Sequence, residues 1–349
     1  MALCPGIVYW SWRLSDGTLA SRAKTFDVNY GLAAFKKVAR RQHANVDVIL
    51  TVGGFRQDSA DFHEVQRDEI TRHRLIQSAY MTSQEYNLSG INLHWIRNED
   101  SCEDLLGGRA PHLEEFVMRL RALFELNGRS KGFSVTAMVD PRDGSQMEFF
   151  RGLANQLNLT FFRTHDLTPL SEFGEYCGNS LPRFRSHLQA LTPFFRPNVR
   201  PSARPAAPPP HQNKLCISMS LALYARQGYA MDLPSPPQAV SGTPGYIALF
   251  EVCDSKINFR EKVRHVPGCI VKRTSSVLLE VTFAFEDWST LSAKLSALGP
   301  KNESCVLLYD VDFDNYRRGC YGSTEYLMLQ YFYSAREKKS RMNITNFLP

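Results

Sequence analysis

Short apolar runs alternate with amphipathic helical segments along most of this chain of 349 residues. The clearest run is Val46–Val52, a nearly continuous apolar stretch that ends at Gly53-Gly54. A run of this kind is typical of a parallel strand that is covered on both faces. Residues 113–126 then place Leu, Phe and Val at i, i+3 and i+4, which is the pattern of a helix with one buried face. This alternation predicts an α/β fold with a parallel sheet and right-handed crossovers.

Seven strands are predicted to carry the sheet, and they begin near residues 7, 46, 90, 132, 159, 214 and 305. We expect residues 13–30 to form a polar loop and residues 64–86 to form one long helix. No GxGxxG motif follows the first strand, which disfavours a dinucleotide-binding doubly wound sheet. A β/α barrel fits the pattern better. Its parts would be 1–226, an α+β insertion domain at 227–282, and 283–349 with the last strand and the C-terminal helix.

Composition excludes several classes of function. The formal charge of +6 is spread along the chain, whereas a nucleic-acid interface needs a dense basic stripe with interleaved aromatic residues. No apolar run reaches the roughly 18 residues of a membrane span. The eight cysteines show no CxxC zinc spacing, and we expect neither a metal nor a cofactor. Residues 1–12 lack the basic start of a signal peptide, so the protein is either cytoplasmic or incomplete at its start, although four Asn-x-Ser/Thr sequons weakly favour secretion.

The stretch 89–96 combines a strand pattern with an unusual set of polar residues. Ile91, Leu93 and Trp95 alternate with small or polar residues, the period of a half-buried strand. The stretch resembles the fourth barrel strand of family 18 glycoside hydrolases, the chitinases, and in particular the catalytically degenerate chitinase-like proteins of arthropods. That strand carries Asp-Gly-x-Asp-x-Asp-x-Glu. Gly90 is kept here, but the four acidic positions hold Ser89, Asn92, His94 and Ile96.

Other segments are similar to motifs of the same family, in the same order. Residues 47–54 resemble the third-strand motif that ends in Gly-Gly, and residues 245–253 resemble the signature of the insertion domain. Residues 162–166 resemble the sixth-strand motif, with Asp166 kept and His165 in place of a tyrosine. Together these segments identify the chain as a member of family 18, and the resemblance implies a TIM barrel.

Two further segments bear on sugar binding. Tyr224-Ala225-Arg226 is similar to the Tyr-Gly-Arg that follows the seventh barrel strand of the family and flanks its sugar groove. Residues 309–316 resemble the eighth-strand motif, with Tyr309 where the family has the tryptophan that forms the floor of the central sugar subsite. By resemblance, the residues that would contact chitin or N-acetylglucosamine oligosaccharides are Trp95, Asp166, Tyr224, Arg226 and Tyr309. For Trp95, packing in the core is an equally strong alternative.

The chain departs from the family between residues 25–30 and residues 31–35. The family places a whole strand there, whereas here the two segments follow each other directly. The expected fold is therefore a (β/α)8 barrel that lacks its second strand. A barrel that lacks a strand must leave edges unpaired or recruit a substitute. The resemblance also implies a disulfide bond between Cys253 and Cys320, an extracellular location and a monomer.

The resemblance implies that the chemistry of the family is absent. In family 18 the substrate's own N-acetyl oxygen is the nucleophile. The glutamate at the position of Ile96 would donate a proton to the leaving oxygen, and an acid at the position of His94 would orient the acetamido group. Ile96 cannot donate a proton and His94 supplies no anion. Loss of a general acid alone removes about 10²–10⁴-fold of rate, so we expect no enzyme activity.

Three hypotheses follow from these observations. The favoured one is a non-catalytic chitinase-like protein that binds N-acetylglucosamine polymers weakly or acts as a secreted lectin-like factor. The second is a residual chitinase, for which Asp140 at a strand end is the nearest candidate carboxylate, although a capping role before Pro141 suits Asp140 better. The third is a partial product of a chitinase-like gene that does not fold stably, which a cooperative thermal melt would reject.

Overall fold

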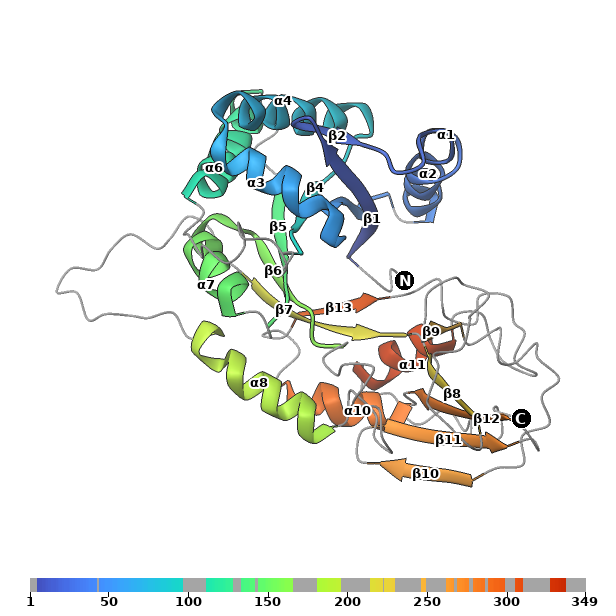
Figure 1. The fold of residues 1–349 in the computed structure, drawn as a ribbon. Helices are drawn as coiled ribbons and strands as arrows, with labels where there is room; N and C mark the ends of the chain where they lie inside the picture. Colours follow the sequence, from blue (N-terminus) through green and yellow to red (C-terminus); the bar gives the residue numbers. More distant parts are fainter. Residues whose placement is uncertain are drawn as a thin grey trace. The chain divides into compact units, whose positions relative to one another are not determined.

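The computed structural model describes residues 5–42, 44–96, 111–127, 133–141, 144–165, 181–195, 214–221, 223–229, 246–248, 262–266, 269–275, 279–285, 288–298, 305–309 and 327–336. The chain divides into two compact units (Figure 1). The first comprises Met1–Phe162 with Pro197–Cys216, and the second comprises Arg163–Arg196 with Ile217–Pro349. All seven predicted strands are present, which confirms the strand assignments made from hydrophobic periodicity.

The first unit is built on a sheet in which five strands run parallel. Its order is β6-β5-β4-β3-β1-β2, and β2 alone is antiparallel to its neighbour. Every residue of β4 is buried, as are all but the first residues of β3 and β5. Burial on both faces explains why these strands are nearly continuous apolar runs. The strand bounds are β1 Gly6–Ser15, β2 Thr18–Ala20, β3 Asp47–Gly53, β4 Gly90–His94, β5 Ser134–Val139 and β6 Leu159–Phe162.

Helices follow the strands of the first unit. They are α1 Lys24–Asn29, α2 Leu32–Gln42, α3 Ser59–Arg67, α4 Glu69–Glu85, α6 Pro111–Leu126 and α7 Gly144–Leu153, with short 3₁₀ turns η1 Arg56–Asp58 and η2 Ala154–Gln156. Helices α3, α4 and α6 pack against one another (Figure 1). The single helix expected at 64–86 is wrong. Asp68 separates α3 from α4 with an extended backbone, and its carboxylate accepts the Thr71 N–H (2.7 Å) as the N-cap of α4.

Among the described residues between β1 and β3 no second parallel barrel strand is present, as expected. β1 pairs directly with β3, from Gly6 opposite Asp47 to Trp12 opposite Val52. The segment expected to be a polar loop instead forms a hairpin, because Asp16 and Gly17 both adopt positive φ (50° and 72°) between β1 and β2. An Asp-Gly pair with this backbone is the two-residue turn that joins twisted antiparallel strands. β2 therefore supplies ladder partners to the end of β1.

The second unit contains β13 Cys305–Tyr309 beside the end of β7 Lys214–Ser220, where the Leu221 N–H donates to the Tyr309 carbonyl (3.0 Å). A five-stranded antiparallel sheet has the order β10-β11-β12-β8-β9. Its strands are β8 Leu223–Tyr229, β9 Tyr246–Ile247, β10 Lys262–Val266, β11 Cys269–Ser275 and β12 Leu279–Phe285. The helices are α8 Leu181–Phe195, α10 Trp288–Ala297 and α11 Leu327–Arg336.

Cys216 and Cys305 are both disulfide-bonded, which the sequence did not predict. Cys253 and Cys320, for which the family resemblance implied a bridge, lie outside the described residues. Within the described part of the chain, no helix has the length and apolar character needed to cross a bilayer.

Candidate functional site

A buried row of polar side chains crosses three strands of the first unit. Asn92 on β4 lies opposite Thr51 on β3 and Thr136 on β5 in the strand register. The Asn92 amide donates to Thr51 Oγ1 (3.2 Å), and Thr136 Oγ1 donates to Asn92 Oδ1 (2.9 Å). All three side chains are fully buried. A neutral amide suits this position because its donor and its acceptor are both satisfied, whereas a buried carboxylate would lose hydration.

The other positions of the fourth-strand motif lie along the same strand. Ser89 precedes β4, and its hydroxyl accepts the Val48 N–H (3.2 Å). His94 is the last residue of β4 and is buried, and Ile96 beyond it is half-buried. None of these side chains can act as a carboxylic acid.

Trp95 lies in the core, where its indole N–H donates to Ser59 Oγ (3.1 Å). The side chain is 5% exposed, and its ring stacks on Phe62 of α3 with centroids 5.6 Å apart. The period of two explains this placement, because Trp95 continues the row of Ile91 and Leu93 rather than that of Asn92 and His94. Trp95 is therefore packed in the core, as the alternative has it, and its role in sugar binding stays a prediction.

An exposed aromatic surface lies at the carboxyl ends of β3 and β4. It consists of the rings of Trp10 and Phe55, which are 40% and 43% exposed with centroids 6.4 Å apart. The Trp10 ring meets the buried imidazole of His94 edge-on, with centroids 5.0 Å apart. Gly54 lies beneath the indole, and its N–H donates to the His94 carbonyl (2.7 Å). Barrel enzymes keep their sites at this end of the strands.

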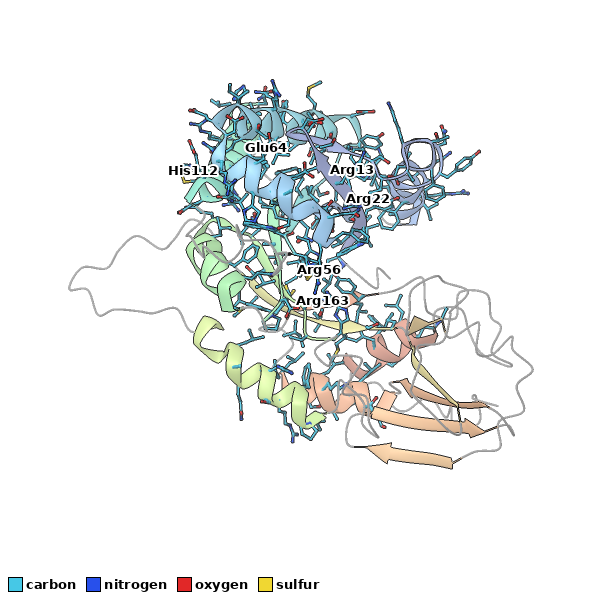
Figure 2. All side chains as sticks on the ribbon, in the orientation of Figure 1. Arg13, Arg22, Arg56, Glu64, His112 and Arg163 are labelled. Carbon is cyan, nitrogen blue, oxygen red and sulfur yellow. The ribbon has the colours of Figure 1, made fainter. Side chains whose placement is uncertain are left out.

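Arg22, labelled in Figure 2, lies in the connection between β2 and α1 and contacts Phe55 of the aromatic surface. Its guanidinium lies 4.3 Å from the centre of the Phe55 ring and pairs with Asp58 (2.6 Å). The same Asp58 oxygen accepts the Phe55 N–H (3.0 Å). Asp58 is 2% exposed, so its charge is compensated within the protein.

A second polar cluster anchors the segment that follows β2. Asp27 on α1 is buried and accepts hydrogen bonds from the hydroxyls of Tyr9 and Ser21. Burial raises the pKa of the Tyr9 phenol, and the hydrogen bond to Asp27 and the charge of that carboxylate add to the shift. The cluster holds α1 against β1.

The second unit holds the remaining predicted sugar contacts. Tyr309 ends β13 half-buried, and its ring lies 4.3 Å from that of His165, whose Nδ1 is hydrogen-bonded to Ser218 Oγ (2.6 Å). Tyr224 and Arg226 lie within β8, opposite Ala284 and Thr282 of β12. Asp166 lies outside the described residues. The roles of these residues in sugar binding stay predictions.

Sequence reasoning missed Trp10, Phe55 and Arg22. A signal was available for Phe55, because an aromatic residue directly after a strand-ending Gly-Gly is placed at the functional end of a barrel strand. Trp10 gave no such signal, since its neighbours Tyr9 and Trp12 are equally aromatic. Arg22 comes from a segment expected to be a loop, and only the tertiary structure brings it to Phe55.

Parallel strands followed by helices, with polar and aromatic residues at the strands' carboxyl ends, define a β/α-barrel protein. The family model for glycosyl hydrolases family 18 matches residues 2–176, half of the chain. The chain therefore belongs to glycosyl hydrolases family 18, which confirms the resemblance drawn from the motifs. No curated protein sequence matches it.

Solved structures of chitinases and of a chitinase-like protein share the fold. The Group IV chitinase of Ostrinia furnacalis in complex with allosamidin superposes with a TM-score of 0.70 at 15% identity, covering 97% of this chain and 92% of that one. The second catalytic domain of the Group II chitinase of the same species gives 0.68 at 15% identity, over 97% and 90%. Human YKL-39, described as a pseudo-chitinase with retained chitooligosaccharide binding, gives 0.66 at 15% identity, over 95% and 91%. The fold is that of the family 18 barrel.

Proposed function

We propose that this protein is a secreted, non-catalytic chitinase-like protein that binds oligosaccharides of N-acetylglucosamine. The observation that carries the proposal is the aromatic surface of Trp10 and Phe55 at the carboxyl ends of the strands. Aromatic rings exposed in this way stack on the apolar faces of pyranose rings, and neighbouring polar groups then fix the orientation of the sugar. The pseudo-chitinase YKL-39, which shares the fold, is described as retaining chitooligosaccharide binding.

The proposed absence of catalysis rests on the residues of the fourth-strand motif. Asn92 is neutral and engaged with two threonines, His94 is buried against Trp10, and Ile96 has no proton to donate. Departure of the leaving oxygen needs a general acid within hydrogen-bond reach. The motif offers none.

Binding is tested with chitotetraose by isothermal titration calorimetry. Trp10→Ala and Phe55→Ala each remove one ring of the aromatic surface, and each is expected to weaken binding at least tenfold, about 1.4 kcal/mol or more. Tyr30→Ala is the matched control, because Tyr30 is an exposed aromatic residue whose ring neighbours Phe26 on α1 instead. Tyr309→Ala tests the contact that the family resemblance implies. A folded wild-type protein with no affinity for chitotetraose contradicts the proposal.

Residual hydrolysis of chitin is the competing function. It can be tested by substitution of Asp140, which is the candidate carboxylate. Asp140 follows β5 half-buried, with its N–H donating to the Gln146 side chain (3.2 Å). The proposal predicts no turnover of a fluorogenic chitobioside by the wild-type protein. Turnover that Asp140→Ala abolishes would establish the hydrolase instead.

A further inference from the structure

Arg22 connects three separate segments around the aromatic surface. Its Nε donates to Ser11 Oγ of β1 (3.2 Å), and its Nη2 donates to the Gly53 carbonyl at the end of β3 (3.3 Å). The same Nη2 pairs with Asp58 at the end of η1 (2.6 Å). Arg22 itself belongs to the short connection between β2 and α1.

Phe55 depends on this network for its orientation. The ring is 43% exposed and begins the η1 turn directly after two glycines, so covalent connectivity restrains it weakly. Two contacts hold it. Asp58 accepts its backbone N–H, and the Arg22 guanidinium covers one face of the ring. A cation over an aromatic face is attracted by the ring quadrupole, and arginine also stacks on it through its planar group.

We propose that Arg22 is a positioning residue for the aromatic surface: it fixes the η1 turn to β1 and β3 and holds the Phe55 ring beside Trp10, where the two rings form the surface proposed to bind sugar. This inference rests on the proposed sugar-binding function. Arg22 acts through Phe55 and Asp58 and makes no contact with the sugar. The connection between β2 and α1 thus contributes to the site a residue that links three segments.

The chemistry requires arginine rather than any cation. Three acceptors from three segments and one ring face are satisfied together by a planar fork of donors. A lysine at this position retains the charge opposite Asp58, but a single ammonium cannot lie flat on Phe55 while reaching Ser11 and Gly53. Arg22→Lys therefore keeps the positive charge but removes the contacts that position Phe55, so the two contributions can be distinguished.

The first experiment monitors the environment and the mobility of the Phe55 ring in the absence of any ligand. 4-Fluorophenylalanine is incorporated at position 55, and its ¹⁹F resonance is compared in wild-type protein, Arg22→Lys and Arg13→Lys. Arg13 is the matched control, an exposed arginine on β1 (Figure 2) whose charge acts on Asp61 of α3. We expect the resonance to move and sharpen in Arg22→Lys alone, because the ring gains freedom. An unchanged resonance in a folded Arg22→Lys protein overturns the proposal.

The second experiment measures whether the effects of Arg22→Lys and Phe55→Leu on chitotetraose affinity depend on each other. Arg22→Lys is expected to lower the affinity about two- to fivefold, with no further loss when Phe55→Leu is already present. A residue that merely stabilises the fold would give additive losses, and additivity overturns the proposal. If Arg22→Lys does not fold, Ser11→Ala removes one of the three acceptors and is expected to shift the ¹⁹F resonance in the same direction. If the wild-type protein does not bind chitotetraose, the proposed function fails while the ¹⁹F comparison still decides the role of Arg22.

Discussion

The indole of Trp10 lies against the backbone of Gly54, so closely that a β-carbon at residue 54 would stand 2.6 Å from the ring. Gly54 also adopts a φ of 102°, which residues with a side chain rarely adopt. Both constraints require glycine here. The Gly-Gly pair that closes β3 therefore shapes the aromatic surface as well as ending the strand.

Gly54→Ala is expected to displace Trp10 and to strain the backbone, with a loss of about 1–3 kcal/mol of stability and of most chitotetraose affinity. The matched control is Gly144→Ala, because a β-carbon there meets no atom within 4 Å. Thermal unfolding and calorimetric titration of both variants check the prediction. Equal behaviour of the two variants would show that the contact with Trp10 is unimportant.

Trp95 is expected to matter for stability and not for sugar binding. Ser59→Ala leaves the buried indole N–H without its acceptor on α3, which costs about 1–3 kcal/mol. Trp95→Phe removes the donor together with part of the ring and also opens space beside Phe62. Both variants are expected to lower the denaturant midpoint while chitotetraose affinity stays within twofold of wild type. A tenfold loss of affinity in a folded Trp95→Phe protein would restore the groove assignment made from the sequence.

Asn92→Asp restores a family carboxylate at a fully buried position. The new side chain loses the donor to Thr51, and burial raises the pKa of its carboxyl above the unfolded value. Because this pKa is raised, the loss of folding stability caused by Asn92→Asp is small at pH values below the unfolded pKa, where the carboxyl is protonated in both states. The loss grows as the pH rises. We expect a loss of about 3 kcal/mol at pH 7 and a much smaller loss near pH 3, each relative to wild type at the same pH. Chemical denaturation at the two pH values provides the measurement, and equal losses would contradict the prediction.

Asp61 gives a second pH dependence. Burial raises the pKa of its carboxyl, and the carboxylates of Asp58, Glu64 and Asp16 raise it further against the opposing charge of Arg13. Its stabilising contribution is therefore present below the unfolded pKa and is lost as the pH rises through the folded pKa. Asp61→Asn is expected to raise the unfolding temperature slightly at pH 7 and to leave it unchanged below pH 3.8, the usual pKa of the group.

Salt provides the control for this effect. The repulsion acts between partly exposed charges, so added salt screens it. The stabilisation by Asp61→Asn should shrink in about 1 M sodium chloride, where the screening length falls to roughly 3 Å. A gain that does not shrink in high salt would show that burial of the carboxyl, rather than repulsion from the neighbouring carboxylates, raises the pKa of Asp61.

Local patterns predicted the strands and helices well, but they did not predict the turns and breaks between these elements. The strands β3, β4 and β5 could be predicted from their apolar runs, because a strand that is buried on both faces needs apolar residues at almost every position. The break at Asp68 and the hairpin at Asp16-Gly17 were missed, although both carry known signals, an N-cap residue and an Asp-Gly turn. The helical pattern continues across Asp68, and the polar residues around Asp16-Gly17 favour a loop over a strand.

The family, the order of the strands and the loss of the second strand could all be predicted from the amino-acid sequence. These properties depend on residue identity and on a period of two or 3.6 residues, both of which are local. The tertiary structure alone decided that Trp95 is core, that Asn92 is satisfied by two threonines, and that Trp10, Phe55 and Arg22 meet at one end of the sheet. Those facts depend on strand register and on contacts between residues from separate segments, which local periodicity does not encode.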